Sequence, residues 1–120
     1  MEAYRLNLLG GFDLYSPAGS QIPLSARKPM ALLAYLALRL DQSHPREKIA
    51  ALLWEDSPDA LARSSLRQAL ALLRRCLPVL VTDADSLCIP SKGLITDVAE
   101  FQRAVAEGSP GLGQFPRPGS

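Results

Sequence analysis

The chain of 120 residues is long enough for one small domain with a modest hydrophobic core. Its 13 basic and 12 acidic side chains leave a net charge of +1, which excludes a strongly basic protein that binds polyanions of every kind. No apolar run reaches the length of a membrane span and the N-terminus lacks a signal-peptide pattern, so we expect a cytoplasmic protein.

The first quarter of the chain has the features of short β-strands. Tyr4–Leu9 alternates in part between apolar and polar residues, and Phe12–Tyr15 and Gln21–Leu24 are further short apolar runs. Turn-forming residues separate these runs, at Gly10-Gly11 and again over 16–20. The pattern predicts a small antiparallel sheet at the N-terminus.

Two helices are predicted next. The first spans Ala26–Leu40, with Ser25 as its cap and Pro29 in the first turn, where the missing N–H is harmless. Its wide apolar face predicts burial of Leu32, Leu33, Leu36, Ala37 and Leu40. After a turn over 41–44, the second helix spans Pro45–Trp54.

The longest predicted helix, over residues 58–77, is the most informative element. Ser57 is a suitable cap, and Pro58 suits the first helical position because its missing N–H would be unsatisfied there anyway. No glycine or proline interrupts the helix before Pro78. Apolar residues recur at helical spacing and predict one buried stripe, formed by Leu66, Leu70, Leu73 and Leu77.

Outside this stripe the helix is rich in arginine. Arg67 and Arg74 lie on one flank of the stripe, and Arg63 lies closer to it near the start of the helix. The face opposite the stripe carries Ser64, Gln68, Ala71, Leu72 and Arg75. Arginine and glutamine are side chains that bond base edges in the major groove, and arginine also pairs with phosphate. Solvated charge on an ordinary bundle helix explains the same pattern, so periodicity alone leaves both interpretations open.

After the long helix the apolar period changes to two. Val79–Thr82 and Leu87–Ile89 flank the polar residues 83–86, which predicts a β-hairpin. Leu94–Thr96 is read as one more short strand.

A last helix is predicted from Asp97, with Glu100 in capping-box spacing. Its apolar side carries Val98, Phe101 and Val105. From Gly108 the sequence is rich in glycine and proline, which predicts a flexible tail or the start of a linker over 108–120.

Together these elements predict an α+β fold with an N-terminal antiparallel sheet, three helices, a C-terminal β-hairpin and a short terminal helix. Three helices followed by a hairpin are the order of a winged helix-turn-helix, in which the third helix reads DNA. We assign this domain to residues 1–107.

Residues 4–106 resemble the N-terminal DNA-binding domain of the Streptomyces antibiotic regulatory protein (SARP) family. These are transcriptional activators whose winged helix is of the OmpR/PhoB type. Five blocks carry the resemblance by their order and spacing: RLNLLGGFDLYSPAGSQIPL, SARKPMALLAYLAL, HPREKIAALLW, SPDALARSSLRQALALLRRCL and LITDVAEFQRAV.

The resemblance implies that the helix over 58–77 is the recognition helix and enters the major groove. It also implies that the second helix approaches a phosphate near Arg46, and that the hairpin is a wing beside the minor groove. The loop from Trp54 to Pro58 matches a segment that in such activators can touch RNA polymerase. Family members commonly bind direct repeats as head-to-tail copies. The resemblance therefore implies double-stranded DNA as the partner and a cytoplasmic, nucleoid-associated location.

These observations lead to an assignment of contacts with double-stranded DNA. The expected base or groove contacts are Ser64, Arg67, Gln68 and Arg75. The expected phosphate contacts are Arg46, Arg63 and Arg74.

Two departures from the family pattern support an alternative. Ala71 and Leu72 stand where relatives tend to carry a polar residue followed by arginine, and an exposed leucine favours a protein partner. Asp83 and Asp85 at the predicted wing tip repel phosphate. The alternative is therefore a winged-helix interaction module that has lost DNA binding.

Enzymatic activity has little support in the sequence, and we expect neither a cofactor nor a metal site. His44 is the single histidine, no cysteine lies near it, and no nucleophile motif is present. Cys76 and Cys88 are expected to be reduced core residues.

Overall fold

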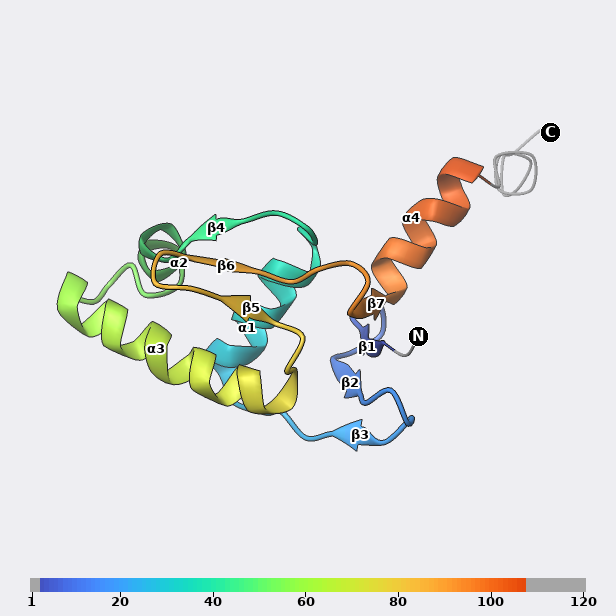
Figure 1. Cartoon of the computed structure of the whole chain (residues 1–120), viewed down its shortest axis with the longest axis horizontal. Helices are drawn as coiled ribbons and strands as arrows, with labels where there is room; N and C mark the ends of the chain where they lie inside the picture. The colour runs from blue at the N-terminus through green and yellow to red at the C-terminus, as the bar shows by residue number, and fades with distance from the viewer. Residues whose placement is uncertain (1–2, 108–120) are drawn as a thin grey trace.

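A computed structural model describes residues 3–107 of the chain, so the tail predicted over 108–120 lies outside the described residues. The elements in chain order are β1 (Tyr4–Asn7), β2 (Asp13–Tyr15), β3 (Gln21–Ile22), α1 (Arg27–Ala37), β4 (His44–Pro45), α2 (Arg46–Leu53), α3 (Asp59–Cys76), β5 (Val81–Thr82), β6 (Ser86–Cys88), β7 (Leu94–Thr96) and α4 (Asp97–Glu107) (Figure 1). This is an α+β arrangement of the winged-helix type, as the sequence predicts: a sheet precedes three helices, a hairpin and a last helix.

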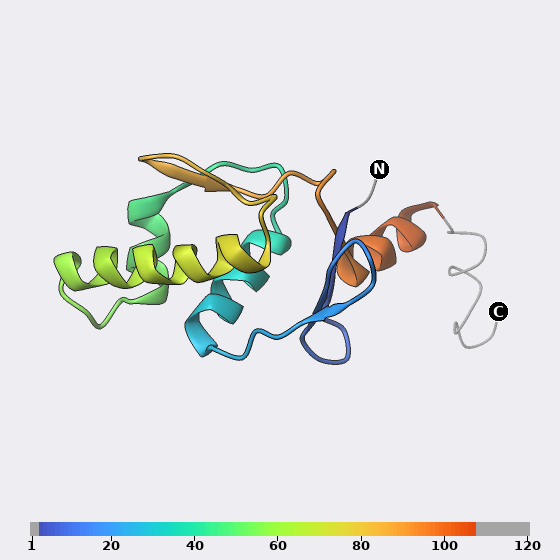
Figure 2. The ribbon, with the colours of Figure 1, turned by 60° about the horizontal axis from the view of Figure 1, so that its bottom comes forward.

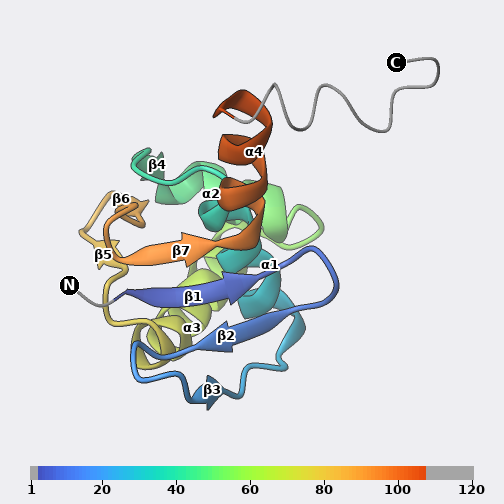
Figure 3. The ribbon, with the colours of Figure 1, turned by 90° about the vertical axis from the view of Figure 1, so that its right-hand side faces the viewer.

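The N-terminal sheet has four strands in the order β3-β2-β1-β7. The first three strands pair antiparallel as predicted, whereas β7 pairs parallel to β1 with Leu6 opposite Thr96. The sheet is therefore mixed rather than wholly antiparallel, because β7 arrives after the chain has passed through the helices and the hairpin. In Figure 3 the helices α1, α2 and α3 lie behind this sheet, and Leu6, Leu14 and Leu94 are buried in it.

The core lies between the sheet and the three helices. The predicted stripe on α3 is confirmed, since Leu66, Leu70, Leu73 and Leu77 are each at most 3% exposed. They belong to one buried cluster that also includes Leu32, Leu33 and Leu36 of α1 and Ile49 of α2. Burial of one such leucine side chain stabilises the fold by roughly 1.5–3 kcal/mol relative to its exposure.

The predicted helix caps are wrong at two helices. Ser25 does not cap α1, whose cap is Ala26 without a side-chain bond. Pro58 rather than Ser57 stands in the cap position of α3, so the helix begins at Asp59. The Ser57 N–H instead donates to the carbonyl of Trp54 at 3.0 Å, which closes the turn at the end of α2.

The first helix also ends three residues earlier than predicted. The Arg39 N–H donates to the carbonyl of Leu36, three residues back, which forms a turn instead of continuing the α-helix. Asp41 then has a positive φ of 68°. Its N–H donates to the carbonyl of Ile89 at 2.9 Å, and its carboxylate accepts the N–H of Ser91 at 2.8 Å. These contacts attach the loop after α1 to the segment that follows the hairpin.

A short strand, β4, replaces the predicted turn and helix start at His44 and Pro45. It pairs antiparallel with β6, so the hairpin belongs to a three-stranded sheet in the order β4-β6-β5. His44 is 6% exposed and lies edge-on to Tyr35, with 5.5 Å between ring centroids. A two-residue strand has no periodicity, which is why the sequence gives no sign of it.

The last helix begins as predicted, but its predicted capping box is wrong. The Thr96 hydroxyl caps it by accepting the N–H of Ala99 at 2.9 Å. The carboxylate of Asp97 accepts N–H bonds from the loop after β1, and Glu100 pairs with Arg5 at 2.8 Å. Its predicted apolar side is largely uncovered, with Phe101 57% exposed. No helix within residues 3–107 is both long and apolar enough to cross a membrane.

Candidate nucleic-acid interface

The outward side of α3 carries the predicted contact residues. Arg67, Gln68 and Arg75 are exposed, and Ser64 is half-buried. Arg63 and Arg74, assigned to phosphates, are exposed as well. Arg75 lies opposite the leucine stripe of α3, whereas Arg63, Arg67 and Arg74 lie on its flank and are still exposed.

Leu72 is not the exposed residue that the sequence predicts, because the structure places it half-buried. It follows Ser65 by two turns and precedes Cys76 by one, and both of these neighbours are half-buried too. Leu72 thus lies at the margin of the buried stripe, on the side away from Arg67. Ala71, which lies on the same face as Gln68 and Arg75, is exposed and is the apolar residue of that face.

A groove of about 520 Å³ brings three elements together. Arg46 reaches it from the start of α2, Arg63 and Arg67 from α3, and Ala84 and Asp85 from the tip of the hairpin. Figure 2 shows the hairpin lying alongside α3. Three of the predicted contact residues therefore lie around one groove, whereas Arg74 and Arg75 belong to the last turn of α3 and do not line it.

Within residues 3–107, the guanidinium groups in this groove form no salt bridge or hydrogen bond, although the charge of Asp83 is close enough to act on Arg46. Arg5 and Glu100 form the only ion pair within residues 3–107. Over the same residues, no side-chain hydrogen bond involves Arg46, Arg63 or Arg67. The Nε atom of Arg46 is buried without an acceptor. The exposed guanidinium groups of Arg63 and Arg67 line the same groove and are chemically suited to an anionic oxygen. Its acidic members are Glu47 and Asp85.

The carboxylate of Asp83 has a structural role that the sequence prediction did not include. Its Oδ1 accepts the N–H groups of Asp85 and Ser86, each at 2.8 Å, and both oxygens lie within 3.2 Å of the Ser86 hydroxyl. These N–H bonds, more than the nearby charge of Arg46, lower the pKa of Asp83 below its ordinary value. The spacing Asp-x-Asp-Ser in a predicted turn is the signal that could have found this role.

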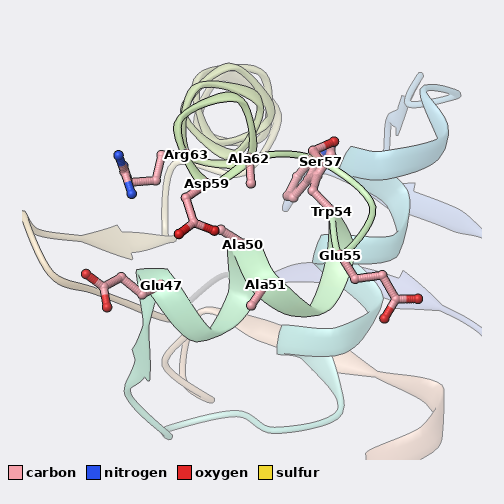
Figure 4. Close-up of a pocket in the computed structure, with 9 residues that line it drawn as sticks. All are labelled: Glu47, Ala50, Ala51, Trp54, Glu55, Ser57, Asp59, Ala62 and Arg63. Carbon is pink, nitrogen blue, oxygen red and sulfur yellow. The ribbon is translucent and has the colours of Figure 1, made fainter.

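A second cleft of about 390 Å³ lies between α2 and the start of α3 (Figure 4). Figure 4 shows Glu47, Asp59 and Arg63 at one end and Glu55 at the other, with Trp54 and small alanines between them. The Lys28 ammonium donates to the carbonyl of Leu53 and lies 5.6 Å from the centre of the Trp54 ring, which attaches α1 to the end of α2. This cleft includes part of the loop over 54–58 that the resemblance assigns to a protein contact.

The remaining chemically active side chains form no cluster. Within residues 3–107, no three His, Cys, Asp or Glu side chains are close enough to hold a metal ion. Cys76 and Cys88 are free thiols, and both are half-buried. The Nε2 atom of His44 is buried without a hydrogen-bond partner.

The site therefore combines a winged-helix fold with an arginine-lined groove between α2, α3 and the tip of the β5–β6 hairpin. No protein-family model matches the chain. It is 31% identical over 87 residues to the transcriptional regulatory protein MoaR1 of Mycobacterium tuberculosis, and equally to MoaR1 of Mycobacterium bovis. The match covers 72% of this chain but 28% of each relative, so the chain spans under a third of their length.

Proposed function

We propose that this chain is the sequence-specific DNA-binding domain of a bacterial transcriptional regulator, with α3 in the major groove. The observation that carries the proposal is the groove in which Arg46, Arg63 and Arg67 converge without forming salt bridges in the described part of the chain. Unpaired guanidinium groups are suited to phosphate oxygens and to guanine edges. The similarity to two transcriptional regulatory proteins supports the same role.

The individual roles follow from where the side chains lie. With its 18 residues, α3 is about 27 Å long and fits lengthwise in a major groove about 12 Å wide. Arg67, Gln68 and Arg75 then read base edges, with Ser64 nearer the start of the helix. Arg46, Arg63 and Arg74 contact phosphates and set the register of the helix on the duplex.

Finer assignments complete the proposal. We assign the domain to the SARP type with an OmpR/PhoB-like winged helix, acting as an activator without enzymatic activity. Two copies bind direct repeats head to tail. The acidic cleft of Figure 4 contacts a basic surface of a protein partner, for which RNA polymerase is the candidate that the resemblance implies.

The test is selection of bound duplexes from a random-sequence library, at a salt concentration of about 50 mM because phosphate contacts weaken steeply with salt. Recovered duplexes are expected to share one motif, repeated in the same orientation about 10–11 base pairs apart. A matched selection with Gln68→Ala is expected to change the motif. Failure to retain any duplex above background would refute DNA binding.

A second candidate function is the interaction module that has lost DNA binding. The acidic residues Glu47 and Asp85 in the arginine-lined groove favour it, because they repel phosphate. One observation behind this alternative, an exposed leucine on the contact face, is wrong, since Leu72 is half-buried. An absence of binding even at low salt, where electrostatic attraction is strongest, would favour this alternative.

A further inference from the structure

The start of α2 is attached to the tip of the wing by one backbone hydrogen bond. The N–H of Arg46 donates to the carbonyl of Asp85 at 2.8 Å. The preceding residue, Pro45, lies opposite Ser86 in the β4–β6 pairing but has no N–H to donate. Among the backbone hydrogen bonds of residues 3–107, the bond from Arg46 is the one that joins the first turn of α2 to the wing turn.

The carboxylate of Asp83 holds the same peptide unit from its other side. The peptide between Asp85 and Ser86 presents its N–H to Asp83 Oδ1 at 2.8 Å and its carbonyl to the N–H of Arg46. In a trans peptide the N–H and the carbonyl point in opposite directions, so fixing one fixes the other. Two hydrogen bonds in series also polarise and strengthen each other.

The backbone position of Arg46 matters because its side chain has little freedom to adapt. The Nε atom is buried without a partner, and the side chain lines the same groove as Arg63 and Arg67. A rotation of the Asp85–Ser86 peptide would release the first turn of α2 and with it the direction of this guanidinium group.

We propose that Asp83 is a positioning residue, whose carboxylate orients the Asp85–Ser86 peptide and thereby directs Arg46 toward a DNA phosphate. The inference rests on the proposed function. It reverses the expectation that Asp83 only weakens DNA binding by repelling phosphate. The two roles predict opposite effects when the whole carboxylate is removed.

The experiment compares Asp83→Ala, Asp83→Asn and Asp85→Asn with the unmodified chain. Asparagine retains an oxygen that accepts the turn hydrogen bonds but carries no charge, whereas alanine retains neither. Asp85→Asn removes an equal charge from the same turn without touching these bonds. The probe is a fluorescein-labelled mixed-sequence duplex of about 30 base pairs at about 50 mM salt, because phosphate contacts do not depend on sequence.

If Asp83 is a positioning residue, Asp83→Ala binds this duplex about fivefold more weakly. Asp83→Asn and Asp85→Asn bind at least as tightly as the unmodified chain, because each loses a repulsive charge. Asp83→Ala has no further effect in an Arg46→Ala background, since the two substitutions then act through one contact. Binding by Asp83→Ala that equals or exceeds that of Asp83→Asn would overturn the inference.

Amide hydrogen exchange separates this inference from the proposed function. Asp83→Ala is expected to speed exchange of the Arg46 amide while leaving Leu73 in the core of α3 protected. Asp83→Asn is expected to leave both unchanged. If the unmodified chain binds no duplex, the proposed function fails, and the exchange result still decides whether Asp83 positions Arg46. Unchanged protection of Arg46 in Asp83→Ala would refute it.

Discussion

Replacing Arg46 by alanine tests the phosphate contacts through their dependence on salt. The assignment gives three phosphate contacts, from Arg46, Arg63 and Arg74. Each neutralised phosphate contributes about −0.9 to the slope of log affinity against log salt, so the expected slope is about −2.7. Removal of Arg46 is expected to reduce its magnitude to about −1.8.

These slopes predict a difference that is easy to measure. Between about 50 and 200 mM salt, the affinity of the unmodified chain is expected to fall about 40-fold, and that of Arg46→Ala about 12-fold. The assay is a fluorescence anisotropy titration of one labelled duplex at five salt concentrations. Because the contact reads no base, Arg46→Ala weakens binding to all duplexes by a similar factor.

Arg103→Ala provides the matched control. Arg103 is an exposed arginine on α4, which Figure 1 shows projecting away from α3 and the wing. Arg103→Ala changes the net charge by the same amount as Arg46→Ala. It is expected to leave the slope of log affinity against log salt near −2.7, about the value for three phosphate contacts. A slope that Arg46→Ala does not change, or that both variants change alike, would refute the assignment of Arg46 to a phosphate.

Three further predictions concern sequence preference, stability and pH. Gln68→Ala is expected to relax the preferred base at one position of a selected motif and to leave the salt slope unaltered, which repeated selection and titration would check. Leu73→Ala removes a fully buried side chain and is expected to destabilise the fold by about 3 kcal/mol, measured by urea unfolding; a loss below about 1 kcal/mol would contradict its place in the core. For Asp97, burial acts to raise the pKa, but hydrogen bonds from the N–H groups of Leu9 and Leu8 dominate and leave it below its ordinary value. A lowered pKa means that the stabilisation is present above about pH 4 and is lost as pH falls below this, so the urea midpoint of Asp97→Asn should depend less on pH in this acidic range than that of the unmodified chain.

Elements with a clear apolar periodicity can be predicted from the sequence. The stripe on α3 extends over three turns, and a helical period of that length has no competing explanation. The hairpin is equally clear, because two short apolar runs flank a polar turn. The exposure of the α3 arginines follows from the same stripe, since the stripe sets the rotation of the helix.

Features that depend on a single residue were predicted less well. The start of α3 was misplaced because Ser57 and Pro58 both suit a helix start, and only the backbone shows which one is the cap. Leu72 was misjudged because a residue at the margin of a helical stripe is buried or exposed according to its neighbours. Helix boundaries and marginal positions respond to contacts that no local pattern encodes.

The residues missed altogether are those whose role lies in contacts between distant segments. His44 becomes a strand residue only because Leu87, far along the chain, pairs with it. The Asp83 carboxylate is linked to the backbone of Arg46 by hydrogen bonds through the peptide that follows Asp85. Local patterns therefore identify which side chains are chemically suited to bind DNA, whereas the hydrogen bonds between the wing and α2 hold the backbone from which Arg46 extends. Substitution of Asp83 in the wing turn is therefore expected to alter DNA affinity, although its carboxylate bonds the turn and not the DNA.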